Sequence, residues 1–161
     1  MKELIEKISS YNIFNYLFPG VVFAFLTTKL TSTKLIFDDI FVGAFAYYFI
    51  GLIISRIGSV IIEPIFKWLK IIQFADYKDF VLVSKKDEKL EILSESNNMY
   101  RTIVSLFLVL LSIIVAERIF ANWVFFTNNQ DIIIIVLLLT LFIFSYRKQT
   151  NFIVKRIKTL K

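Results

Sequence analysis

The chain contains no cysteine and no histidine, and only two of its 161 residues are proline and four are glycine. The absence of cysteine excludes disulfides, thiolate nucleophiles and cysteine-ligated zinc. The absence of histidine removes imidazole metal ligands and the side chain that most often acts as a general base near neutral pH. No spacing of Asp, Glu, Lys, Ser or Tyr forms a recognisable catalytic motif. We therefore expect no enzymatic activity, no cofactor and no metal site.

Long polar stretches are also scarce. The only one covers residues 63–101, and it separates two pairs of apolar runs. The first pair covers residues 13–30 and 36–57, and the second pair covers residues 103–126 and 132–146. Hydrophobic residues make up 57% of the chain, against roughly 45–50% in soluble domains. The pattern predicts an all-α membrane protein with four transmembrane helices arranged as two hairpins.

This layout divides the chain into three parts. Residues 1–62 would form an amino-terminal interfacial helix and the first transmembrane hairpin. Residues 63–101 would form a cytoplasmic segment of two or three short helices, with a β-hairpin through residues 80–83 as the alternative. Residues 102–161 would form the second transmembrane hairpin and a basic cytoplasmic tail. The interfacial helix is expected because the first ten residues alternate apolar and charged side chains at helical spacing.

The placement of lysine and arginine predicts the orientation. Nearly all of the 19 basic residues lie at the amino terminus, in the polar segment or in the tail, whereas the two short linkers contain only Lys29 and Lys34. Loops rich in lysine and arginine stay in the cytoplasm. We therefore expect a multi-pass protein of a bacterial inner membrane with both termini cytoplasmic. The net charge of +6 follows this topology, so we expect no direct binding of duplex nucleic acid.

Several residues of the first two apolar runs are candidates for a pore or a gate. Pro19 and Gly20 interrupt the first run, where they could act as a hinge or produce a static kink. Gly51 and Ser55 lie on one face of the second run. Small residues at this spacing favour close helix packing, and a pore-lining face is the alternative.

Glu117 and Arg118 form the only adjacent charged pair within an apolar run. Charged residues at such positions normally face other helices or water. A structural ion pair of Arg118 with Asp38 or Asp39 is the first interpretation. A ring of charge around an oligomer axis, which would select ions, is the second.

The polar segment contains the candidates for ligand binding, which are Lys67, Trp68, Lys70, Tyr77, Lys78 and Arg101. Aromatic rings among cations can stack on a base and hold a phosphate. The alternative is a small aromatic core whose lysines extend towards lipid headgroups. The tail could contact anionic lipid, a partner helix or an anionic ligand.

Residues 11–20 (YNIFNYLFPG) and 94–101 (SESNNMYR), together with the four-span layout, resemble small membrane proteins of bacterial anti-phage defence. One similar group is the Hailong membrane effectors, which are oligomeric channels gated by a cyclic oligonucleotide. Another is the Kiwa membrane subunits, which sense phage attack and recruit a cytosolic DNA-binding partner. The first resemblance implies an oligomeric, nucleotide-gated ion channel, and we expect this chain to form a homotetramer. The second implies a non-conducting sensor or anchor that docks a cytosolic defence protein.

We favour the channel because the predicted cytoplasmic part is too short for an enzyme and large enough to cap a ligand. The resemblance contributes no site residues. A small ion-coupled transporter built around Glu117 is a further alternative.

Overall fold

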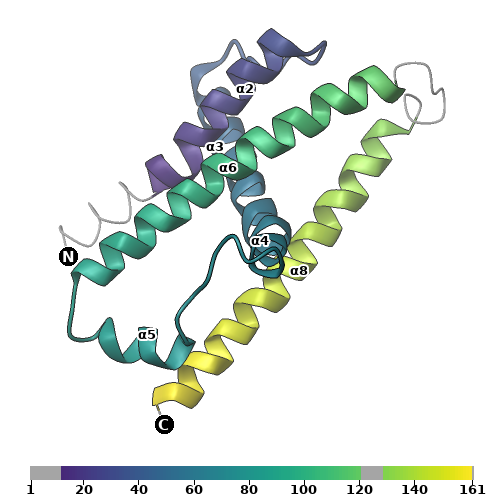
Figure 1. Cartoon of the computed structure of the whole chain (residues 1–161). Coiled ribbons are helices and arrows are strands. Elements are labelled where there is room, and N and C mark those ends of the chain that lie inside the picture. Colours follow the sequence, from purple (N-terminus) through teal and green to yellow (C-terminus); the bar gives the residue numbers. More distant parts are fainter. Residues whose placement is uncertain (1–11, 121–128, 161) are drawn as a thin grey trace.

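A computed structural model describes residues 12–120 and 129–160 of the chain (Figure 1). The described residues form helices and no strands, which confirms the predicted all-α class. In chain order these elements are η1 (Ile13–Leu17), α2 (Phe18–Leu30), α3 (Ile40–Ile57), η2 (Gly58–Ile62), α4 (Glu63–Trp68), α5 (Tyr77–Val83), α6 (Lys89–Phe120) and α8 (Gln130–Leu160). The interfacial helix predicted in the first ten residues lies outside the described residues.

Three described segments are long and apolar enough to cross a membrane. They are Ile13–Leu30, Ile40–Trp68 and Lys89–Ile119, and they correspond to the first three predicted apolar runs. The fourth run, residues 132–146, starts α8 but is shorter than the about 20 residues that a bilayer core requires. It is not among the three, so a count of four spans stays a prediction.

Both prolines follow a π-helical turn. Pro19 follows η1 and Pro64 follows η2, and in each case the residue four positions earlier lies in that turn. A proline ring inside an α-helix clashes with the carbonyl group at that position and removes one hydrogen bond. A π-turn widens the helix locally, so each helix continues past its proline.

The structure corrects two predicted helix boundaries, the end of the second apolar helix and the start of the third. The second apolar helix does not end near residue 57 but continues through η2 and α4 to Trp68, so the first residues of the polar segment belong to it. α6 begins at Lys89 and continues to Phe120 without a break, since it contains neither glycine nor proline. The polar segment and the third apolar run are therefore parts of one long helix. The alternative hairpin at residues 80–83 is also wrong, because α5 covers them.

The interior is small and partly polar. Phe23, Ile54, Leu106 and Leu110 form the apolar core. Asn15, Ser55, Thr102 and Ser105 are also at least 99% buried, whereas large apolar side chains such as those of Ile40, Phe41 and Phe45 are more than three quarters exposed. Polar and small side chains between helices, with apolar side chains outside, are typical of helices packed in lipid.

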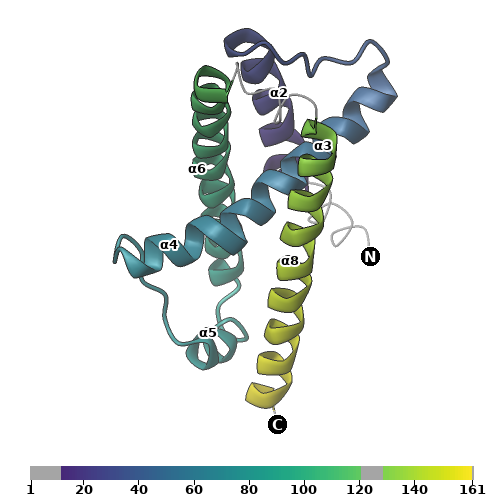
Figure 2. The same ribbon diagram turned by 90° about the vertical axis from the view of Figure 1, so that its right-hand side faces the viewer.

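α5 and the carboxyl-terminal turns of α8 lie at one end of the molecule, and at this end α6 and α8 lie apart (Figures 1 and 2). The helix formed by α3, η2 and α4 crosses between them (Figure 2). α8 packs against α3, η2 and α5. This arrangement brings the polar segment and the tail to the same end of the bundle.

Candidate functional site

A cavity of about 890 Å³ lies between α4, α5, α6 and α8. This volume lies within the range of about 300–1,000 Å³ that is common for small-molecule sites. Its wall contains five basic residues, Lys67, Arg101, Arg147, Lys148 and Lys155. It contains only two acidic residues, Glu63 and Asp76. Its aromatic residues are Phe74, Tyr77, Phe80, Phe144 and Phe152.

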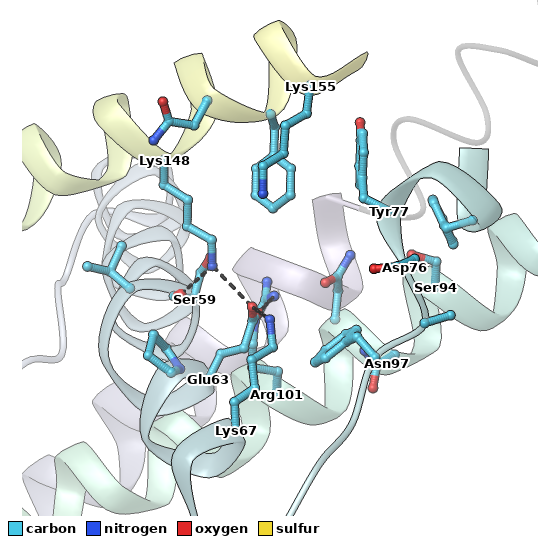
Figure 3. A pocket seen from close by; sticks show the side chains of 18 of the residues that line it. Ser59, Glu63, Lys67, Asp76, Tyr77, Ser94, Asn97, Arg101, Lys148 and Lys155 are labelled. Carbon is cyan, nitrogen blue, oxygen red and sulfur yellow. Dashed lines mark hydrogen bonds and ion pairs between the residues drawn. The ribbon is translucent and has the colours of Figure 1, made fainter. Parts of the chain in front are cut away.

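The Glu63 carboxylate lies where three helices meet, and its side chain is only 8% exposed (Figure 3). Its Oε2 atom is 2.8 Å from the Arg101 Nη1 atom of α6. Its Oε1 atom is 3.0 Å from Nζ of Lys67, one turn along the same helix, and 3.3 Å from Nζ of Lys148 in α8. These are all the ion pairs of the described residues. One carboxylate therefore connects α4, α6 and α8.

Lys148 connects α8 to η2 as well. Its ammonium group donates hydrogen bonds to the backbone carbonyl of Ser59 and, at 2.9 Å, to the Ser59 hydroxyl. Burial lowers the pKa of Lys148, and the neighbouring Glu63 carboxylate opposes this shift. Ser59 thus accepts hydrogen bonds from a lysine 89 residues later in the chain.

The cavity combines positive charge with aromatic surface. Three cations share the single Glu63 carboxylate, while Arg147 and Lys155 form no ion pair within the described part of the chain. The Tyr77 and Phe152 rings are 5.8 Å apart between centroids, so α5 meets α8 through an aromatic contact. Cations beside exposed rings can hold an anionic ligand that carries a planar group.

The structure separates the six predicted ligand-binding residues into two groups. Lys67, Tyr77 and Arg101 line the cavity. Trp68, Lys70 and Lys78 do not line it and are exposed, Trp68 by 80%. The sequence suggests an anionic ligand at the tail as one alternative but identifies no ligand-binding residue there, whereas α8 supplies Arg147, Lys148, Asn151 and Lys155 to the cavity. The spacing of Lys148, Asn151 and Lys155 is three and four residues, which places them on one helix face and could have revealed them.

The pore and gate candidates of the first two helices are packing residues within the chain. A Cβ atom added to Gly20 would overlap the Tyr47 carbonyl oxygen, and one added to Gly51 would overlap the Tyr16 carbonyl oxygen. Pro19 is fully buried beside them. These contacts agree with the packing interpretation, and a role in a pore stays a prediction.

Ser55 belongs to the same interior. Its hydroxyl is 3.2 Å from the Thr102 hydroxyl of α6, which is also 3.1 Å from the Asn15 side-chain oxygen. The network joins η1, α3 and α6. Ser55 is 1% exposed and therefore does not face a pore within one chain.

Glu117 and Arg118 have different surroundings. The Glu117 carboxylate accepts hydrogen bonds from the backbone and side chain of Ser32, at 3.1 and 2.8 Å. Arg118 is not in any ion pair of the described residues, so its suggested pairing with Asp38 or Asp39 is not found. Asp39 instead caps α3 by accepting hydrogen bonds from the first backbone amides of that helix.

Comparisons with protein families, curated proteins and solved structures find no match to this chain.

Proposed function

We propose that this protein is a homotetrameric channel of a bacterial inner membrane, which opens in anti-phage defence when a cytosolic anionic ligand binds its cavity. The composition of the cavity wall is the observation that supports this proposal. Its five basic residues exceed its two acidic residues, and aromatic rings stand beside them. This composition suits a phosphorylated ligand with a planar group, such as a cyclic oligonucleotide.

The proposal includes a topology of four spans with both termini cytoplasmic. In that topology the first half of α8 is the fourth span, and the polar segment and the tail lie on the cytoplasmic side. Both parts line the cavity, which would therefore open to the cytosol. The exposed apolar surface of the other helices would face lipid and the neighbouring copies.

Gating would use the helix that continues from α3 into α4. Glu63 and Lys67 near its end line the cavity, while Gly51 near its middle packs against η1. A ligand opens a channel only if it binds the open state more tightly than the closed state. Movement of this helix would change its packing against Gly20 and the preceding Pro19, and Glu117 would lie near the far end of the conducting path.

A second candidate is a membrane sensor or anchor that conducts nothing and docks a cytosolic defence protein. The exposed side chains of Trp68, Lys70 and Lys78 favour it. Trp68 is 80% exposed and lies outside the cavity. An exposed tryptophan among lysines is typical of both protein-binding and membrane-interface surfaces.

Membrane-potential measurements during phage infection separate the two candidates. The chain is expressed alone and with its genomic neighbours, as the wild type and with Arg147→Gln and Lys155→Gln combined. A channel gated through the cavity depolarises the membrane with its neighbours present, and the double variant abolishes this. Lys78→Gln is the matched control outside the cavity and leaves depolarisation unchanged. An unaltered potential, together with a neighbour that co-purifies through Trp68, contradicts the channel and supports the anchor.

A further inference from the structure

The buried Glu63 carboxylate has more positive partners than it can neutralise. Lys67, Arg101 and Lys148 all lie within 3.3 Å of it, and neither Asp76 nor any other described acid forms an ion pair with them. Like charges gathered in a partly buried site repel one another unless anions balance them. The cluster therefore lacks negative charge, and the adjoining cavity provides room for a second anion.

The three cations are held differently. Lys67 belongs to the same helix as Glu63 and its side chain is 46% exposed. Arg101 and Lys148 come from α6 and α8, and their side chains are 21% and 26% exposed. Only these two contacts connect separate helices through Glu63. Both side chains also line the cavity (Figure 3), so an anion there could contact them directly.

We propose that Glu63 is an internal counter-ion which a phosphate group of an anionic ligand displaces from Arg101 and Lys148. The phosphate would take the Arg101 guanidinium in a bidentate contact, the geometry that guanidinium and phosphate groups share. Lys148 would turn from Glu63 to the same phosphate, and Glu63 would keep Lys67. This inference rests on the ligand-binding part of the proposed function and identifies how the site is regulated.

The exchange has a structural consequence. Without the ligand, Glu63 holds α4 against α6 and α8. With the ligand, Arg101 and Lys148 bind the phosphate, and Glu63 no longer joins α4 to α6 and α8, while the hydrogen bonds of Lys148 to Ser59 keep α8 beside η2. The two states differ in named contacts, which is the condition for a ligand to shift their populations.

Binding to the full chain in phosphatidylcholine nanodiscs tests this exchange. Pyrophosphate and ATP serve as the probes, and their Kd values are measured for the wild type, Glu63→Gln and Asp76→Asn. Glu63→Gln removes the competing carboxylate, so we expect Kd to fall about tenfold. Asp76→Asn is the matched control, since it makes the same charge change in the cavity wall without breaking an ion pair, and we expect less than a threefold change.

Several results would overturn the proposal. These are an unchanged or weaker Kd in Glu63→Gln, an equal gain in Asp76→Asn, and no binding of either probe to any variant. If Glu63→Gln does not fold, Glu63→Asp replaces it. That variant keeps the charge but has a side chain one methylene shorter, which lengthens and weakens the contacts with Arg101 and Lys148. We therefore expect a Kd about threefold lower, and a wild-type Kd contradicts the exchange.

Nanodiscs that also contain phosphatidylglycerol identify the natural source of the phosphate. Competition with the probes assigns the site to a lipid headgroup, and unchanged probe binding assigns it to a soluble ligand; both results support phosphate recognition at this cluster. Ion flux from vesicles separates this inference from the channel. Tighter binding by Glu63→Gln without flux contradicts the channel and leaves the exchange of partners intact.

Discussion

At the scale of single residues, two glycines allow the first two apolar helices to meet backbone to backbone. Gly20 lies against the carbonyl group of Tyr47, and Gly51 lies against that of Tyr16. The contact is reciprocal, because each helix supplies one glycine and one carbonyl group. Helices in lipid gain their association energy from such close packing.

Alanine at either glycine should separate the two helices. Gly20→Ala and Gly51→Ala are expected to cost about 1–3 kcal/mol, the usual range for overpacking. Gly43→Ala is the matched control. Its added Cβ would be 3.4 Å from the nearest atom, in the Tyr47 ring, which is an ordinary van der Waals contact, and alanine is the better helix former. Unfolding in a detergent titration measures these changes, and equal stability of all three variants would contradict the packing.

The Thr102 hydroxyl should stabilise the junction of η1, α3 and α6. Thr102→Val keeps the shape but leaves Asn15 and Ser55 without this partner, and we expect a loss of about 1 kcal/mol. Thr140→Val is the control, since the exposed Thr140 hydroxyl only donates to the Val136 carbonyl of its own helix. Thermal unfolding in one detergent compares them. A larger loss in Thr140→Val would show that the buried network contributes little.

At the scale of helices and loops, the sequence predicted which segments are helical better than where they end. The Ser96–Asn98 stretch resembles a helix boundary, because serine and asparagine side chains often compete with helical hydrogen bonds. In the structure the Ser96 hydroxyl donates to the Ile92 carbonyl and Thr102 donates to that of Asn98. These side chains bond within the helix, so α6 continues through them.

The candidate site was only partly predictable for a different reason. Lys67, Tyr77 and Arg101 were found because they gather in one polar segment. The partner of Glu63 in α8 is Lys148, 85 residues later in the chain. No local pattern links such distant residues. The helical spacing of Lys148, Asn151 and Lys155 indicates only that they share one polar helix face.

The contact between α5 and α8 can be tested by cross-linking, because the chain has no native cysteine. Tyr77 and Phe152 have ring centroids 5.8 Å apart, so Tyr77→Cys with Phe152→Cys should be joined by a short bifunctional thiol reagent. Tyr77→Cys with Leu160→Cys is the control, since Leu160 lies about 12 Å further along α8. Cross-linking is read as a shift in gel mobility after proteolysis between the two positions. Preferential cross-linking of the control pair would contradict the placement of α5.

At the scale of the whole molecule, the polar and apolar surfaces are arranged for a lipid environment. The core is small, the buried contacts of Thr102, Ser55 and Asn15 are polar, and large apolar side chains cover the outside. The cationic cavity lies at the end formed by the polar segment and the tail. The proposed function requires that this end faces the cytosol, where a ligand or a partner protein can reach it.

Labelling of single cysteines with a membrane-impermeant maleimide tests that requirement most directly. The variants are Asn151→Cys, at the cavity, and Lys34→Cys, in the loop between α2 and α3. We predict that Asn151→Cys in the membrane fraction reacts only in inverted vesicles, and that Lys34→Cys reacts in spheroplasts. Labelling of Asn151→Cys from outside the spheroplast, or recovery of the chain without detergent in the soluble fraction, would contradict the account.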